Sequence, residues 1–256
     1  MFKFLQYTII LQFILLTISS CTHVNPSTKN LKQPRLRLLH DSGYVTKQEV
    51  LPFLLEAKLT DTSDWWSKIS NNDTLGQYYR SEKNGYYYMM ATAWSNRDSA
   101  TMEYLIELSK EGDFIGSIEA YGGNWSFGVD GNYYSDFHKV GKYFTTSFSP
   151  HGTGYFGTWI HIFDTLVCIN ELSAIFTGCY SIHGSSNFNP QNIYSTYDIV
   201  DSICTVHYFI EEGVDDEKSN DILWDKPTER IIRYKYDGKS WEAEDSSLLK
   251  GMDIYY

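Results

Sequence analysis

Histidine is the side chain in this sequence that could most readily bind a metal ion. His161 and His207 each alternate with aromatic or β-branched residues, so each imidazole is expected on one face of a strand. Two such strands lying side by side could share a metal ion between their rings. The compact ligand spacings H-x-H, H-E-x-x-H and C-x-x-C do not occur in the sequence. We therefore expect packed or surface histidines, and we predict no metal ion and no cofactor.

A glycine-rich string at residues 152–157, G-T-G-Y-F-G, matches the G-x-G-x-x-G pattern of nucleotide-binding loops. A dinucleotide site needs a helix directly after the glycines, whereas residues 158–164 predict a strand. The string also resembles the glycine-rich loop of protein kinases, which needs a nearby lysine, but residues 143–217 contain no Lys or Arg. We therefore predict no bound nucleotide. We interpret residues 149–157 as a flexible connection that presents Tyr155 and Phe156 to a partner.

The sequence offers little for nucleophilic or carboxylate catalysis. It contains no G-x-S-x-G turn for a catalytic serine, and its acids are too numerous for a catalytic pair to be chosen. Beyond Cys21, three cysteines remain, and an oxidising compartment would allow one disulfide among them. Cys168 and Cys179 flank a predicted turn, so they could face each other across a hairpin, with Cys204 as a buried thiol. A register shifted by one residue would separate them, and both arrangements stay open.

Aromatic residues are unusually frequent: 21 Tyr, 14 Phe and 7 Trp make up 16% of the chain. Several are adjacent, and neighbours on a strand point to opposite faces, so one of each pair is expected near solvent. Exposed aromatic rings are suitable platforms for sugars or protein partners. We therefore predict possible binding roles for Trp65, Trp66, Tyr155 and Phe156. Simple filling of the sheet faces is the alternative.

The first twenty residues have the order of a secretory signal: Lys3, an apolar run over residues 4–18, and then two serines. Residues 18–21, I-S-S-C, resemble the lipobox of bacterial lipoproteins. This resemblance implies that residues 1–20 are removed and that Cys21 carries acyl chains such as palmitate, which anchor the protein in a bilayer. Thr22 after the cysteine, in place of Asp, favours the outer membrane of a Gram-negative envelope. An ordinary signal peptide is the alternative.

Residues 21–42 contain Pro26, Pro34 and four basic residues, and they predict a flexible basic tether. Residues 43–256 predict a single acidic domain that is mainly β. The alternation over residues 101–109, flanked by strands at 86–94 and 113–121, predicts an antiparallel meander. Thr46 and Glu49 predict a capping box for a short helix.

Turn signals separate the rest of the domain into further strands. They are predicted at residues 141–148, 158–164, 166–172, 174–183, 192–200, 202–211, 230–236 and 240–244. The last two are joined by Asp237-Gly238, a typical hairpin turn. One or two short N-terminal helices precede the strands, including a helical turn at residues 64–69. The spacing favours a sandwich, a barrel or a propeller-like stack over βαβ units.

Composition excludes several classes of protein. The net charge is −11, which disfavours nucleic-acid binding. The aromatic content argues against disorder, and the mean hydropathy of −0.36 argues against a polytopic membrane protein. We expect an envelope lipoprotein that binds a protein or a glycan without catalysis. The alternatives are a glycan hydrolase that uses carboxylates and an immunity-type lipoprotein that neutralises a basic toxin.

Overall fold

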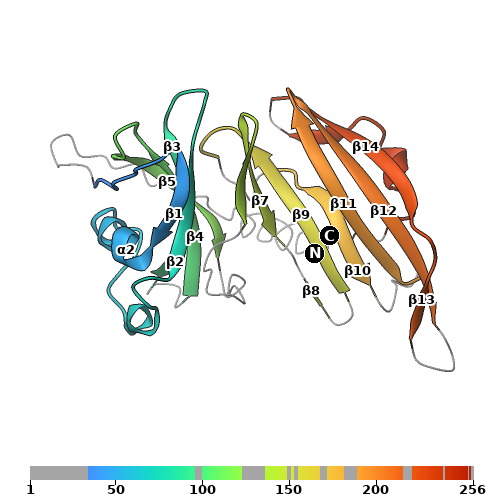
Figure 1. Ribbon diagram of the computed structural model, residues 1–256, viewed down its shortest axis with the longest axis horizontal. Helices are drawn as coiled ribbons and strands as arrows, with labels where there is room; N and C mark the ends of the chain where they lie inside the picture. The colour runs from blue at the N-terminus through green and yellow to red at the C-terminus, as the bar shows by residue number, and fades with distance from the viewer. Residues whose placement is uncertain are drawn as a thin grey trace, which may run out of the picture.

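The structure is a computed structural model that describes residues 34–95, 100–122, 136–148, 151–152, 155–167, 172–181, 189–215, 221–238, 240–252 and 254. The predicted signal segment and Cys21 lie outside these ranges. Two antiparallel sheets, of five and ten strands, form a sandwich-like arrangement (Figure 1), which confirms the mainly β prediction. Within the described ranges, no helix is long and apolar enough to cross a membrane.

The smaller sheet is a meander in sequence order, β1-β2-β3-β4-β5. Its strands are β1 (Ser42–Thr46), β2 (Thr74–Arg80), β3 (Tyr87–Ser95), β4 (Ala100–Leu108) and β5 (Phe114–Gly122). The pairing of β4 with both β3 and β5 confirms the predicted three-stranded meander. Gly112 closes the turn between β4 and β5 at a φ of 85°, a conformation that glycine adopts without strain. Residues 96–99, between β3 and β4, lie outside the described residues.

The helix α2 (Lys47–Glu56) packs on the smaller sheet. The predicted capping box is confirmed: the Glu49 carboxylate accepts hydrogen bonds from the Thr46 N–H and hydroxyl, each at 2.8 Å. Phe53 and Leu54 are buried against the sheet in one apolar cluster, which also contains Met89. A 3₁₀ turn, η1 (Asp64–Lys68), follows, as the sequence predicts.

The larger sheet has the order β15-β14-β12-β11-β10-β9-β7-β6, with β8 paired to β9 and β13 paired to β12. Its strands are β6 (Phe137–Val140), β7 (Tyr143–Phe148), β8 (His151–Gly152), β9 (Tyr155–Phe163), β10 (Ile175–Ser181), β11 (Gln191–Val200), β12 (Ile203–Asp215), β13 (Ile222–Trp224), β14 (Thr228–Tyr236) and β15 (Trp241–Ala243). The 3₁₀ turn η4 (Ser246–Leu249) comes last. The predicted β14–β15 hairpin is confirmed. The strand predicted at residues 166–172 is not found at its described ends, Leu166, Val167 and Leu172.

The two sheets meet through buried aromatic side chains. Phe137, Phe144 and Phe163 of the larger sheet form one apolar cluster with Tyr88 and Leu105 of the smaller sheet. A separate apolar cluster consists of side chains from the larger sheet and the C-terminal residues. In this cluster the Tyr208 hydroxyl donates a hydrogen bond to the Phe176 carbonyl. Both faces of the smaller sheet are therefore covered, one by α2 and the other by the larger sheet.

The chain is already packed at Pro34, before the predicted domain start at residue 43. The Phe114 N–H donates to the Pro34 carbonyl, and Leu36 is only 4% exposed. Arg35 makes two hydrogen bonds to the Asp113 carboxylate, at 2.5 and 2.7 Å. These contacts fasten residues 34–36 to the β4–β5 turn, so they belong with the folded domain and not with a free tether.

Candidate binding face

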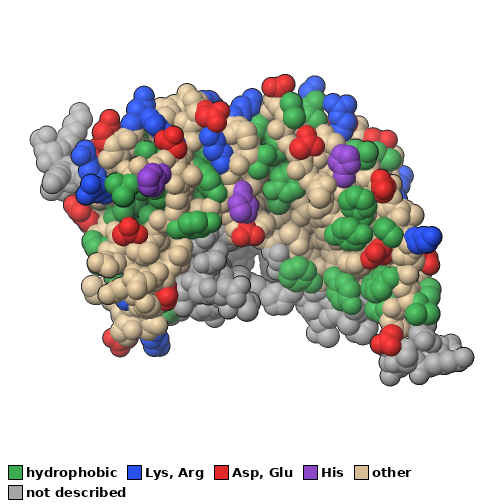
Figure 2. All heavy atoms as spheres, viewed as in Figure 1, with side chains coloured by type: hydrophobic (Ala, Val, Ile, Leu, Met, Phe, Trp, Pro, Cys, Tyr) green, Lys and Arg blue, Asp and Glu red, His purple; other side chains and the backbone are tan. Residues whose placement is uncertain are grey.

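Alternation along β11 leaves one face of the larger sheet open to solvent. Ile193 and Ile199 point into the core, whereas Tyr194, Thr196 and Asp198 are exposed. The same alternation continues on β12, because Tyr194 lies opposite Phe209 in the pairing. Figure 2 shows hydrophobic side chains gathered on this face, over the region where Figure 1 places β9–β12.

A trough runs across this face where the sheet divides between β10 and β11. All ten residues of β11 pair with β12, but only residues 191–193 pair with β10. At the point of division the register of β10 shifts around Thr177. Gly178 lets the two strands approach there, because a Cβ on it would lie 2.6 Å from the Ile193 carbonyl oxygen.

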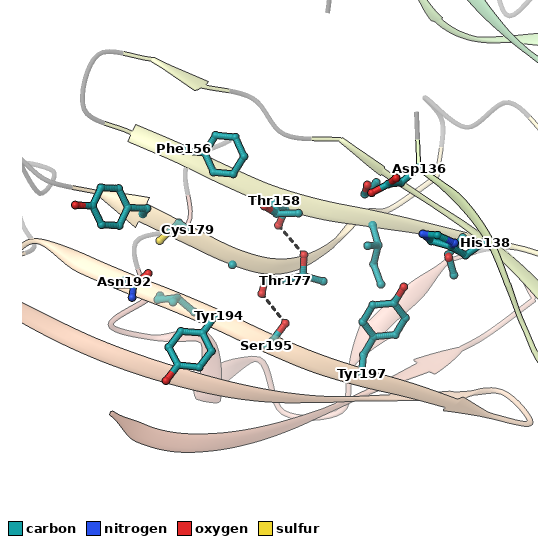
Figure 3. Close-up of a pocket in the computed structure, with 16 residues that line it drawn as sticks. Asp136, His138, Phe156, Thr158, Thr177, Cys179, Asn192, Tyr194, Ser195 and Tyr197 are labelled. Atoms are coloured by element: carbon teal, nitrogen blue, oxygen red, sulfur yellow. Dashed lines mark hydrogen bonds between the residues drawn. The ribbon is translucent and has the colours of Figure 1, made fainter. Parts of the chain in front are cut away.

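The trough has a volume of about 480 Å³ and a floor of hydroxyl groups. The Ser195 hydroxyl donates to the Thr177 carbonyl at 2.5 Å, and the Thr177 hydroxyl donates to the Thr158 carbonyl at 3.1 Å. Figure 3 shows these three residues between two aromatic rings, Phe156 on the β9 side and Tyr194 on the β11 side. Phe156 is 48% exposed and Tyr194 is 44% exposed.

Neighbouring side chains hold the rim of the trough in place. Tyr194 stacks on Phe209 with ring centroids 5.3 Å apart, and Tyr180 packs against Trp224 at 5.8 Å. Asn192 donates a hydrogen bond of 2.6 Å from its side-chain amide to the Glu211 carboxylate. These contacts restrict the rotamers of the rim residues, so a ligand would meet side chains that are already positioned.

The described lining of the trough carries little charge, and that charge is negative. Among the described residues that line it, Asp136 is the one carboxylate, and Lys and Arg are absent. His138 and the tyrosines carry the titratable rings of this lining. Glycoside hydrolysis needs two carboxyl groups that flank the scissile bond. The described lining supplies a single one, so it lacks the second carboxyl group that this reaction needs.

The structure places the aromatic residues singled out in the sequence in three different settings. Phe156 lines the trough. Tyr155 begins β9, but its side chain lies outside the description. Trp66 is 6% exposed and lies in the core, and Trp65 stacks on Trp94 with centroids 5.6 Å apart. The tryptophan pair therefore serves packing under α2, not an exposed platform.

The glycine-rich stretch differs from the expected flexible connection. His151 pairs with Phe156 and Gly152 pairs with Tyr155, so β8 and β9 form a hairpin around residues 153–154, which lie outside the description. Gly152 is the last residue of β8, and Gly157 lies within β9, where it pairs with Cys179. This hairpin continues directly into the β9 edge of the trough.

The histidine and cysteine candidates are distributed over separate parts of the larger sheet. His161 is on β9 and His207 on β12, with β10 and β11 between them, so these two rings do not share a site. Within the described ranges, no group of three His, Cys, Asp or Glu residues could hold a metal ion. Cys204 is buried, and burial raises the pKa of its thiol to about 12, with a smaller contribution from Asp198. Cys179 is buried on β10, and Cys168 lies outside the described residues.

Sequence reasoning missed most of the rim. Tyr180, Tyr194, Phe209 and Trp224 come from four different strands, and nothing in their local spacing links them. The alternation in residues 192–200 was the available signal, because it marks Tyr194 as outward-facing. The strand register that brings the four together is a property of the folded sheet.

Comparison with known proteins adds no relative: no family model, no curated protein and no solved structure matches the chain. The trough and the open face around it are therefore the features that indicate a function. Their geometry offers aromatic planes, hydroxyl and amide groups, and weak negative charge in one place.

Proposed function

We propose that this chain is a non-catalytic binding protein of the cell envelope, whose docking surface is the open face over β9–β12. One observation carries the proposal: Phe156, Tyr180 and Tyr194 are each more than two-fifths exposed and surround one trough. Soluble domains rarely expose grouped large rings without a partner for them. Such rings are also the residues that dominate binding energy at recognition surfaces.

The lipobox-like residues 18–21 support the membrane-anchored part of the proposal. Acyl chains on Cys21 would anchor the protein to the outer membrane of a Gram-negative envelope, with the β domain outside the bilayer. A binding protein gains from this anchor, because it concentrates the docking face near envelope proteins and glycans. The partner is a protein or a glycan, and no nucleotide or nucleic acid is expected, because the charge of the chain disfavours both.

The experiment is co-sedimentation of the purified protein with a Gram-negative envelope fraction, and every protein in it carries Cys21→Ser so that no acyl chain holds it to the membrane. We expect the double change Phe156→Ala with Tyr194→Ala to abolish co-sedimentation. Tyr44→Ala, which removes a 61% exposed ring on β1 of the smaller sheet, is the matched control and should co-sediment as the wild type does. Equal sedimentation of the double variant and the wild type would overturn the proposal.

The net charge of −11 favours a second candidate, an immunity-type lipoprotein that binds a basic toxin. Binding between oppositely charged surfaces weakens with ionic strength. In this case the protein should capture a cationic toxin domain at low salt and release it at high salt. Capture that persists at high salt would contradict this second candidate.

A further inference from the structure

We infer that the trough between β10 and β11 binds an uncharged glycan, a chain of pyranose rings that stacks on Phe156 and Tyr194. This inference rests on the proposed binding function and names the class of its ligand. The shape of the trough, the groups on its floor and the charge of its lining support it.

The arrangement of rings and hydroxyls matches the two kinds of surface on a sugar. A pyranose presents C–H groups on its faces and hydroxyl groups around its edge. Phe156 and Tyr194 supply aromatic planes for the faces. Phe156 is on β9 and Tyr194 is on β11, so their strands are separated by two strand spacings, about 10 Å. The Ser195 and Thr177 hydroxyls already donate to carbonyls, so their oxygens supply acceptors for the edge, and the Asn192 amide oxygen adds another.

The floor also argues against a protein side chain as the occupant. An apolar side chain pressed onto the Thr158, Thr177 and Ser195 hydroxyls would cover their remaining oxygen lone pairs without offering a donor. The hydroxyl groups of a sugar do offer donors. A hollow of about 480 Å³ is within the usual range for small-ligand sites.

Charge selects against acidic sugars. The described lining contains Asp136 and neither Lys nor Arg. Glu211 lies next to the rim, where it accepts the hydrogen bond from Asn192. A uronic acid or a sulfated sugar would therefore meet negative charge without a cation to pair with it.

The platform extends beyond the trough, which favours a chain of several rings. Phe156, Tyr180 and Asn192 lie in register on three neighbouring strands, and Glu211 continues the row on β12. Trp224 on β13 packs against the ring of Tyr180. A glycan that crosses the strands would thus meet aromatic and hydrogen-bonding groups beyond the first ring.

Titration calorimetry of the purified protein with cellohexaose, mannohexaose, maltohexaose and chitohexaose tests the inference. Polygalacturonate and chondroitin sulfate are the acidic controls. We expect a neutral probe to bind, both acidic probes to fail, and Phe156→Ala and Tyr194→Ala each to weaken binding roughly tenfold or more. Tyr44→Ala should bind as the wild type does, and the thermal midpoints of all three variants should stay within a few degrees of the wild type because none of these side chains is buried.

Failure of every neutral probe, preference for the acidic probes, or undiminished binding by both trough variants would overturn the inference. These outcomes are separable from failure of the proposed function. If envelope co-sedimentation needs Phe156 and Tyr194 but survives periodate oxidation of the glycans and is lost after protease treatment, the binding function stands and the glycan inference is wrong. If co-sedimentation needs neither residue, the binding function fails first.

Discussion

Lowering the pH from 7 to 4.5 should destabilise the fold through His161. This ring is 5% exposed on β9 and stacks on Phe148 with centroids 5.1 Å apart. Burial lowers its pKa from 6.5 to about 4, against a smaller opposing effect of a backbone hydrogen bond with Leu172. The unfolded chain therefore binds a proton near pH 6.5, while the folded chain resists it until about pH 4.

The sign follows directly from this difference. Above pH 6.5 both states hold a neutral ring and the group costs nothing, whereas between pH 6.5 and 4 protonation favours the unfolded state. At 1.36 kcal/mol per pKa unit, the loss between pH 7 and pH 4.5 comes to about 2 kcal/mol of unfolding free energy. This is a large fraction of the stability of an ordinary domain.

Urea unfolding of the wild type and of His161→Phe, each at the two pH values, measures this loss. Phenylalanine keeps an aromatic ring against Phe148 but cannot bind a proton, so the variant should lose about 2 kcal/mol less than the wild type on acidification. Comparing each protein with itself removes the cost of the substitution and the titration of other groups. Equal losses in the two proteins would refute the reasoning.

Three further predictions test packing and anchoring. Gly112→Ala should lower the free energy of unfolding by about 2–4 kcal/mol, because its Cβ would lie 2.0 Å from the Leu36 carbonyl oxygen. Gly251→Ala has a similar positive φ but lies in open space, so it should lower the free energy of unfolding by about 1 kcal/mol. Equal drops in thermal midpoint would contradict this. Tyr208→Phe should cost about 1–3 kcal/mol in urea unfolding, because it leaves a buried carbonyl without its donor, and an unchanged midpoint would speak against that bond. Labelled palmitate should enter the wild type but not Cys21→Ser in Gram-negative cells, and equal labelling of both would reject the lipid anchor.

Local patterns predicted the elements that depend on neighbouring residues. The capping box of Thr46 and Glu49, the β3–β5 meander and the β14–β15 hairpin all follow from residues only a few positions apart. The strands β1 and β2 were not predicted. β1 is short, and the pairing of Val45 with Gly76 joins segments on either side of α2.

Long-range packing accounts for what the sequence pattern could not predict. The alternation over residues 101–109 predicted a strand, but it did not show that Leu105 and Glu103, on the face opposite Ile106, are as buried as Ile106 itself. The larger sheet covers that face, and a local period contains no sign of this packing. Trp66 lies in the apolar cluster of α2 and the smaller sheet, whose members come from distant parts of the chain.

The order of the strands has a consequence for how the chain folds. Along both sheets each described strand pairs with a strand close to it in the sequence, and the short β8 and β13 also pair with direct neighbours, β9 and β12. Such pairings close short loops, so an all-β chain of this kind should form its hairpins quickly and without long searches. The seam between the sheets, around Phe137, Phe144 and Tyr88, joins distant segments and should consolidate last. Pulse-labelled hydrogen exchange during refolding should protect the amides of β3–β5 and β11–β14 before those of β6 and β7, and the opposite order would show that the seam nucleates the fold.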